Sequence, residues 1–298
     1  MKQCKQRFLL VSDMHYTTEL MDKELRKLYP EARTSLAAGS AFGYTQRQKI
    51  DKITEAVFAE NAEHPLDAVL VLGDLSIDDY DARNLPDNYC KKFKEECMDL
   101  LPCPAYAQPG NHDSYTDSLW EEVFGYHRQH SVKLGDCVFV MLDTFANCPG
   151  VAGPGASYNA PDLDFLRSEL EKYPTERIFL CAHHFEPRAE AALGEVLKAN
   201  PRITCLFRGH THHNAVMYPA EYQGTPLVDI GGYAYSGQVV NGTYTFNIFD
   251  QAWAWGYEIV EIYEDGVSMY HVKPTMDYRA ENGDFHVERT VSGELKLS

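Results

Sequence analysis

Short apolar runs alternate with longer amphipathic stretches along most of this 298-residue chain, and that alternation constrains its fold more than any other feature. The runs are bounded in length and rich in β-branched and aromatic residues, as buried strands are. They lie at 8–11, 68–72, 105–107, 138–142, 178–182 and 203–207. Helix-like segments separate them at about 46–62, 88–100, 117–127, 161–172 and 187–199. Alternation of this kind predicts helices packed on central sheets.

The pattern changes after residue 207. Strands without intervening helices are predicted at 216–218, 227–230, 243–249 and 258–263. Asp265-Gly266, followed by an apolar run at 267–272, predicts a hairpin. We therefore expect the C-terminal third to extend a sheet with antiparallel strands. The predicted domain covers 1–273, and 274–298 is predicted to be a charged C-terminal tail that can pack on it.

Composition narrows the classes of partner. The formal net charge is −17 and the isoelectric point is near 5.1, so a grip on a polyphosphate backbone is disfavoured and no nucleic-acid partner is expected. The apolar run after the short basic N-terminus is too brief for a signal peptide, and no run reaches the roughly 18 apolar residues of a spanning helix. We expect a cytoplasmic protein without a membrane partner.

The eight cysteines include no C-x-x-C pair. Cys103, Cys137, Cys181 and Cys205 lie in or beside predicted strands, where cysteines pack as small hydrophobic residues. Buried free thiols are therefore expected, and a pairing of Cys90 with Cys97 is an open alternative.

Side chains that can bind metals follow five of the predicted strands. The five segments are Asp13-Met14-His15, Gly73-Asp74, Gly110-Asn111-His112-Asp113, His183-His184 and Gly209-His210-Thr211-His212-His213. Each has a plain structural explanation on its own, such as a Gly-Asp turn or a packed core histidine. Ligands in open α/β sheets lie beyond the carboxyl ends of the strands, so the ordered set predicts one shared site.

The ligand types indicate the metal. Imidazole, carboxylate and one amide oxygen suit Mn, Fe or Zn better than a thiolate-preferring metal. Side chains two apart on an extended strand end point to one side, so Asp13 with His15, and His210 with His212, are expected to face the site together. The set exceeds the needs of one tetrahedral ion and suits two ions about 3.5–4 Å apart that share a carboxylate.

The five segments resemble the signature motifs of the calcineurin-like metallophosphoesterase superfamily, which are D-x-H, G-D, G-N-H-[DE], H and G-H-x-H. The resemblance spans residues 13–212, and every ligand position is present. It implies an α/β fold, namely a four-layer α/β/β/α sandwich of two mixed β-sheets flanked by helices.

The resemblance also implies a metal-dependent phosphoester hydrolase with two divalent or trivalent transition-metal ions. One ion would be held by Asp13, His15, Asp74 and His212, and the other by Asp74, Asn111, His183 and His210. Asp74 would bridge them, and a bridging hydroxide would attack phosphorus in line. His112 matches the catalytic position that protonates the leaving group or stabilises the transition state.

Departures from the motifs indicate the branch. Protein Ser/Thr phosphatases carry G-D-x-V-D-R-G, whereas residues 73–79 contain no Arg. Purple acid phosphatases place a metal-binding Tyr where this chain has Ile77. The segment is more similar to bacterial phosphodiesterases, so small phosphodiesters such as cyclic nucleotides or glycerophosphodiesters are the expected substrates. A phosphomonoesterase or nucleotidase, a nuclease, a mononuclear esterase and a non-catalytic protein-binding scaffold stay open.

Substrate recognition is expected from the loops at 16–45 and 144–160, since long loops in compact domains are often functional. Tyr16 and Tyr44 could stack on a ring and Arg47 could pair with a phosphate, unless all three simply pack the loop. The segment 231–235 is expected to line the site, 185–187 to shape its wall, and His184 and His213 are weaker candidates for substrate contact.

Overall fold

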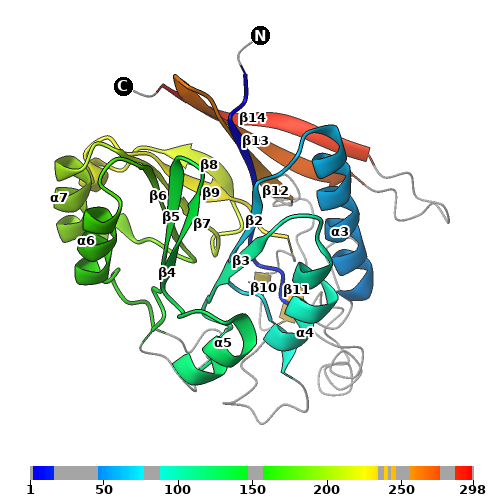
Figure 1. Cartoon of the computed structure of the whole chain (residues 1–298). Coiled ribbons are helices and arrows are strands. Elements are labelled where there is room, and N and C mark those ends of the chain that lie inside the picture. The colour runs from blue at the N-terminus through cyan, green and yellow to red at the C-terminus, as the bar shows by residue number, and fades with distance from the viewer. Residues whose placement is uncertain are drawn as a thin grey trace.

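The fold consists of two six-stranded mixed sheets packed face to face, with helices on their outer faces (Figure 1). The computed structural model describes residues 3–16, 46–76, 88–113, 115–146, 157–233, 238–240, 243–245, 256–275 and 286–296. The four-layer α/β/β/α arrangement expected from the sequence is confirmed.

The first sheet has the strand order β14-β13-β12-β1-β2-β3. Its parallel part consists of β1 (Gln6–Val11), β2 (Ala68–Leu72) and β3 (Ala105–Gln108). Its antiparallel part consists of β12 (Tyr257–Ile262), β13 (Gly266–Thr275) and β14 (His286–Lys296). The hairpin predicted around Asp265-Gly266 joins β12 to β13.

The second sheet has the order β4-β5-β6-β7-β9-β8. Its strands are β4 (His130–Leu134), β5 (Cys137–Leu142), β6 (Arg177–Ala182), β7 (Ile203–Arg208), β8 (Asn214–Met217) and β9 (Leu227–Ile230). The four central strands are parallel, and the edge strands β4 and β8 are antiparallel. A separate two-stranded sheet pairs β10 (Gln238–Val240) with β11 (Thr243–Thr245).

The helices fall into two groups (Figure 1). The first sheet is covered by α3 (Gln46–Glu63), α4 (Tyr89–Glu96) and α5 (Asp117–Phe124). The second is covered by α6 (Leu163–Lys172) and α7 (Ala191–Ala199). Short 3-10 turns are η1 (Met98–Leu100), η3 (Pro187–Ala189) and η4 (Ala220–Tyr222). The Asp162 side chain accepts from the amides of Asp164 and Phe165 and begins α6, within the helix-like segment predicted at 161–172.

Three apolar cores separate the four layers. Successive strand side chains point to opposite faces, so Leu9 and Val11 pack in the helix-side core while Phe8 faces the other sheet. The Phe8 ring lies 4.7 Å from that of Phe139, on β5 of the second sheet. A third core joins the outer face of the second sheet to α6 and α7. Strands with two apolar faces explain why the sequence showed continuous apolar runs.

Some predicted elements need correction. The strand β4 was not predicted, and β9 pairs parallel to β7 rather than antiparallel. Residues 286–296, predicted as part of a charged tail, form β14 and pair with β13. The boundary of the domain at residue 273 stays a prediction. Residues 243–245 of the predicted strand 243–249 form β11. The rest of that prediction, 246–249, lies outside the described residues.

The cysteines are free thiols where they are described. Cys90 and Cys97 are buried and form no disulfide with each other, which settles the open alternative. Cys137, Cys181 and Cys205 are buried as expected, whereas Cys103 is only half-buried. Cys148 lies outside the described residues. Among the helices within the described ranges, none combines the length and apolar character needed to cross a membrane.

Candidate metal centre

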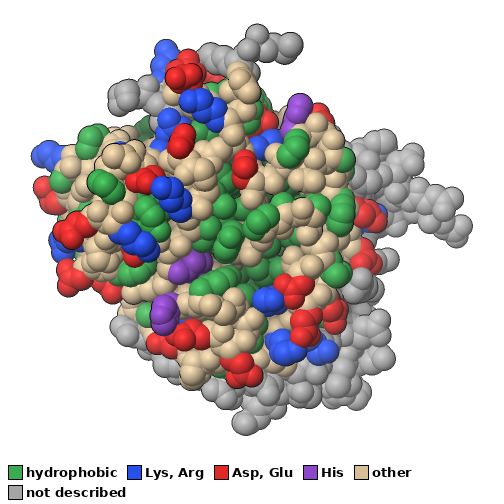
Figure 2. All heavy atoms as spheres, viewed as in Figure 1, with side chains coloured by type: hydrophobic (Ala, Val, Ile, Leu, Met, Phe, Trp, Pro, Cys, Tyr) green, Lys and Arg blue, Asp and Glu red, His purple; other side chains and the backbone are tan. Residues whose placement is uncertain are grey.

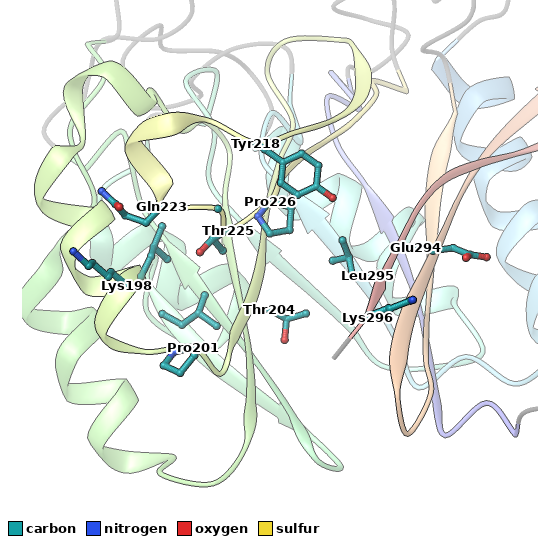
Figure 3. A pocket seen from close by; sticks show the side chains of 13 residues that line it. Lys198, Pro201, Thr204, Tyr218, Gln223, Thr225, Pro226, Glu294, Leu295 and Lys296 are labelled. Atoms are coloured by element: carbon teal, nitrogen blue, oxygen red, sulfur yellow. The ribbon is translucent and has the colours of Figure 1, made fainter. Parts of the chain in front are cut away.

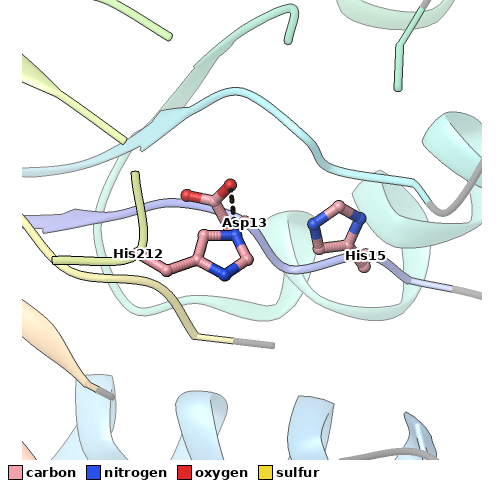
Figure 4. Close-up of side chains that lie close together, drawn as sticks. All are labelled: Asp13, His15 and His212. Carbon is pink, nitrogen blue, oxygen red and sulfur yellow. Dashed lines mark hydrogen bonds and ion pairs between the residues drawn. The ribbon is translucent and has the colours of Figure 1, made fainter. Parts of the chain in front are cut away.

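The carboxyl ends of the parallel strands of both sheets converge on one group of side chains. Asp13 and His15 follow β1, and His212 follows β7 in the other sheet, yet their ligand atoms lie within 4.8 Å of one another (Figure 4). The Asp13 Oδ1 atom lies 3.0 Å from Nε2 of His212, and its Oδ2 accepts from the backbone amide of His210 at 3.0 Å. A fully buried carboxylate therefore joins the two sheets.

A second group forms beside the first, from Asp74, His183 and His210. His183 Nε2 lies 3.2 Å from Asp74 Oδ2 and 3.3 Å from His210 Nδ1. The amide oxygen of Asn111 lies 3.1 Å from His183 Nε2 and 2.9 Å from His210 Nδ1. Four nitrogen and oxygen atoms thus crowd into one small volume.

Asp74 lies between the two groups, and its carboxylate also forms a third set of ligand atoms with His15 and His112, within 4.8 Å of one another. Its Oδ2 is 3.2 Å from His183 and 3.6 Å from Nε2 of His15. Its Oδ1 accepts from the backbone amide of His112 at 2.8 Å. The ring of His112 lies 4.8 Å from the ring of His15, so it faces the Asp13–His15 side. The six side chains that the sequence predicted as ligands beside Asp74, together with His112, are all brought to this one place.

The donor chemistry fits a bound cation. The Nδ1 atom of His183 lies 2.8 Å from the carbonyl oxygen of Leu72, which can only accept, so Nδ1 carries the hydrogen. In neutral His183 the Nε2 lone pair then faces a carboxylate and an amide oxygen. Acceptors that face each other at this distance need a proton or a metal ion between them. A carbonyl that holds the tautomer is also the usual partner of a metal-binding imidazole.

The backbone of the site is unusual. Of the described non-glycine residues, six have a positive φ, and five of these belong to the predicted ligand set. They are Asp13 (57°), His15 (43°), Asp74 (51°), His210 (63°) and His212 (51°). Such a conformation costs about 1–2 kcal/mol per residue, and strained residues cluster at functional sites. The expectation of extended strand ends is therefore wrong, and the left-handed turns send His210 and His212 into different groups.

The charges in the site are strongly coupled. Burial alone would raise the pKa values of both carboxyl groups, but His212 holds Asp13, and His183 holds Asp74, well below the usual range. Burial alone would lower the pKa of His183, but Asp74 outweighs it and raises that pKa to about 9. Burial lowers the pKa of His15 well below its usual value. Buried carboxylates that keep their charge create a site that attracts cations.

Comparison with known proteins identifies the family. The sequence matches the calcineurin-like phosphoesterase family over residues 6–214, which is more than half of the chain. The chain belongs to this family. It is therefore a member of a family of metal-binding phosphoester hydrolases. A comparison with curated proteins finds no significant match.

Among solved structures similar to this calcineurin-like phosphoesterase, one shares its fold at a TM-score above 0.5. A dimetal phosphatase from Danio rerio is 16% identical, with a TM-score of 0.60 over 97% of this chain and 99% of that one. Vacuolar protein sorting 29 from Cryptosporidium parvum is 14% identical, with a TM-score of 0.42 over 99% and 100%. An NAD nucleotidase from Haemophilus influenzae is 10% identical, with a TM-score of 0.34 over 98% and 50%. At such identities, the first of these shows the fold alone.

Asp113 holds two ligand loops of the phosphoesterase together. Its carboxylate accepts from the amides of Leu75 and Ser76 after β2, and from the amide of Gly110 after β3, at 2.9–3.0 Å. The Asp74 loop and the Asn111 loop are thereby joined. Gly73, at φ +86°, packs so closely that a Cβ there would lie 2.5 Å from Nδ1 of His183. The Gly-Asp motif therefore needs its glycine for contact with the imidazole.

Aromatic side chains flank the His183–His210 half. The ring of Phe145, after β5, lies 5.8 Å from that of His183 and 6.0 Å from that of His210. The ring of His184 lies 4.6 Å from that of His210 and 5.2 Å from that of Tyr158, and burial lowers the pKa of His184 to about 3. The sequence drew attention to the loop that holds Phe145 and Tyr158 but not to these residues, which carry no motif.

Several residues predicted to contact the substrate either pack elsewhere or lie outside the described residues. Tyr16 is buried, donates its hydroxyl to Glu96 at 2.8 Å and packs beside Phe93, so its packing explanation holds. Tyr44 and the side chain of Arg47 lie outside the described residues, as do 234 and 235.

The other predicted wall segments divide between the site and the core. Gly232 does line the site, because a Cβ there would lie 3.1 Å from the ring of His212. Phe185 belongs to the outer core of the second sheet rather than to a cleft wall. His213 is exposed, and its amide donates to the Thr211 hydroxyl at 3.3 Å.

Proposed function

We propose that this protein is a dinuclear metal-dependent hydrolase that prefers small phosphodiesters, such as cyclic nucleotides or glycerophosphodiesters. The observation that supports two ions is the position of Asp74, whose Oδ2 lies 3.2 Å from His183 and 3.6 Å from His15. One carboxylate between two histidine groups is the arrangement that a pair of ions shares.

The ligand assignment follows the two groups. Asp13, His15, Asp74 and His212 would hold one ion, and Asp74, Asn111, His183 and His210 would hold the other. Manganese, iron and zinc are the metals that this donor set favours. When bound, the ions would supply a hydroxide nucleophile at neutral pH and neutralise charge on the phosphoryl oxygens.

One side chain of the protein itself, that of His112, would supply a proton in the reaction. His112 is partly exposed, and its backbone amide is fixed to Asp74. Its imidazole is therefore held beside the site without being one of the predicted ligands. From there it can donate a proton to the departing alkoxide.

The charges around the site support a diester over a monoester. Among the described residues, Arg128 contacts the backbone of Asp113 and Arg208 that of Phe185, both beside ligand loops, and each arginine is committed to an aspartate. Arg128 Nε lies 2.6 Å from Asp143, and Arg208 forms an ion pair with Asp229. Neither guanidinium is left to clamp a dianionic monoester. A monoanionic diester needs less positive charge from the protein.

Two sequence expectations about partners and location stay predictions. The expected substrate is a small phosphoester, and no nucleic acid is expected. On the face shown in Figure 2, Lys and Arg side chains are interspersed with Asp and Glu. The cytoplasmic location is also still a prediction.

A phosphoester panel tests the proposal. Protein whose metal content has been quantified would be loaded with Mn²⁺ and assayed on bis-p-nitrophenyl phosphate, cyclic nucleotides, glycerophosphodiesters, nucleotides and sugar phosphates. We expect a higher kcat/KM on a diester than on any monoester. A preference for nucleotides or other monoesters would favour the phosphomonoesterase alternative. Two bound ions without turnover on any substrate would favour the protein-binding scaffold.

A further inference from the structure

Arg208 occupies a position that no motif explains. It is the last residue of β7, directly before Gly209 and His210, and it is only 9% exposed. In the sheet it lies opposite Ala182 of β6 on one side and Asp229 of β9 on the other. A buried arginine at the point where three parallel strands end needs partners for all of its donors.

The guanidinium finds those partners on both neighbouring strands. Its Nε and Nη2 donate to the two carboxylate oxygens of Asp229, the second at 3.3 Å. Its Nη1 donates to the backbone carbonyl of Phe185, beyond the end of β6. One planar group therefore joins the segments that follow three adjacent strands.

Those three segments carry ligands or contact them. Phe185 lies two residues after His183, and Arg208 lies two residues before His210. Asp229 precedes Gly231 and Gly232, and a Cβ on Gly232 would touch the His212 ring at 3.1 Å. A change in the Arg208 contacts would therefore shift His183 against His210, whose ring nitrogens are 3.3 Å apart.

Stability alone does not explain this pair. Buried ion pairs are often replaced by apolar residues at no cost in stability, so their retention needs another reason. Here the loop after Arg208 contains two left-handed residues, His210 and His212. Strained backbone persists only where the surroundings determine it. A bidentate arginine fork supplies a directional constraint that an apolar contact lacks.

We propose that Arg208 is a positioning residue that sets the spacing of His183 and His210 and thereby the affinity of one half of the metal centre. This proposal rests on the proposed dinuclear function. In the Asp74–His183–His210 group, His183 and His210 follow strands that Arg208 joins. In the Asp13–His15–His212 group, only His212 does. The group with Asp74 should therefore be affected more.

The variants are Arg208→Met, Arg208→Lys and the double variant Arg208→Met/Asp229→Leu. The double variant removes the carboxylate that the single variant leaves buried and unpaired, so it should stay folded. Arg202→Met is the matched control. Arg202 precedes the amino end of the same strand, and its guanidinium donates to the backbone carbonyls of Leu170 and Tyr173.

The readout is Mn²⁺ binding. Calorimetry measures the affinity of each ion, and electron paramagnetic resonance detects the spin-coupled pair. In wild type we expect two ions. In Arg208→Met and the double variant we expect one binding step to weaken about 10- to 100-fold, as for other partners of metal ligands, and the coupled signal to be lost at limiting metal. Arg208→Lys keeps the charge but not the fork, so it should restore less than half of the loss in free energy. Arg202→Met should bind both ions like wild type.

Wild-type binding of both ions by the double variant would overturn the proposal. Equal weakening of both ions, or the same loss in Arg202→Met, would also overturn it, because either result indicates general destabilisation. Wild-type protein that binds fewer than two ions would instead overturn the dinuclear function, and this proposal with it.

Discussion

The two ends of the second sheet differ in what they present to solvent. At the amino ends of the strands lie two hollows, a cavity of about 490 Å³ beside Tyr218 and Leu295 (Figure 3) and another of about 400 Å³ beside Lys133. At the carboxyl ends lie His183, which is buried, and the His210–His212 loop, which contacts the Asp13 carboxylate of the first sheet.

Chemistry, and not volume, separates the two ends. Charges near the amino end are satisfied at the surface, as in the ion pair of Lys133 with Glu176 at 2.5 Å. The one left-handed non-glycine residue described there is Gln223, in the turn that ends η4. The carboxyl end instead holds buried carboxylates and strained backbone. Strain and buried charge are costly, and they are the signs of a functional site.

Loss of the Asp74 carboxylate, which the two groups of ligands share, should have the largest effect of any change at the carboxyl end. In Asp74→Asn we expect the kcat on bis-p-nitrophenyl phosphate to fall by a factor of about 10³ or more, because the variant weakens both ion sites at once. Metal analysis should find fewer than two ions per chain. The matched control at the amino end is Glu176→Gln, which should keep full activity. Equal activity of Asp74→Asn and wild type at full metal loading would contradict the role of Asp74.

Replacement of His112 should have the second-largest effect. In His112→Gln we expect kcat on an alkyl phosphodiester to fall about 10²- to 10³-fold, as for loss of a general acid. The fall on bis-p-nitrophenyl phosphate should be much smaller, because p-nitrophenolate leaves without a proton. Metal content should stay at the wild-type value. An equal fall on both substrates would contradict proton donation by His112.

The sequence was most informative where local pattern and burial agree. The central parallel strands could be predicted because both of their faces are apolar. Two of the edge strands, β4 and β14, could not: β14 exposes 57% of Val291, and Arg289 turns to Glu60 at 2.9 Å. Pairing with β13 stabilises this strand, and that partner is not visible in a local window.

The ligand residues could be proposed from their motifs, but the geometry that presents them could not. The left-handed turns at His210 and His212 depend on contacts from the other sheet, such as the Asp13 carboxylate on the His210 amide. The ion pair of Arg208 with Asp229 left one weak sign in the sequence. Arg208 ends an apolar run and Asp229 interrupts another, and a charge in a buried strand needs a partner.

Metal binding should depend on pH in a defined direction. In the metal-free protein the Asp74 carboxylate outweighs burial and raises the pKa of His183 to about 9 from 6.5. A proton must leave His183 before an ion binds, so the apparent affinity should rise about tenfold per pH unit between about pH 7 and 9. The same shift stabilises the metal-free fold fully below about pH 6.5, and this stabilisation is lost as pH rises through 9.

Calorimetry in two buffers of different ionisation enthalpy measures the protons released. At about pH 7 we expect more protons released per chain than well above pH 9, by about one, because His183 has already lost its proton at the higher pH. Metal-free Glu176→Gln, altered at the amino end, should show the same release as wild type. An affinity that stays constant between pH 7 and 9 would contradict the assigned coupling of His183 with Asp74.

A substitution at the amino-end cavity should have the smallest effect. Tyr218 is 61% exposed at its rim (Figure 3), so Tyr218→Ala should change the free energy of unfolding by no more than about 0.5 kcal/mol. Its kcat/KM on the best diester should stay within about twofold of wild type, because none of the predicted ligands lines this cavity. A larger loss in kcat/KM with unchanged metal content would show that substrate reaches the amino end. The contrast between a hollow without buried charge and a compact site with it would then no longer hold.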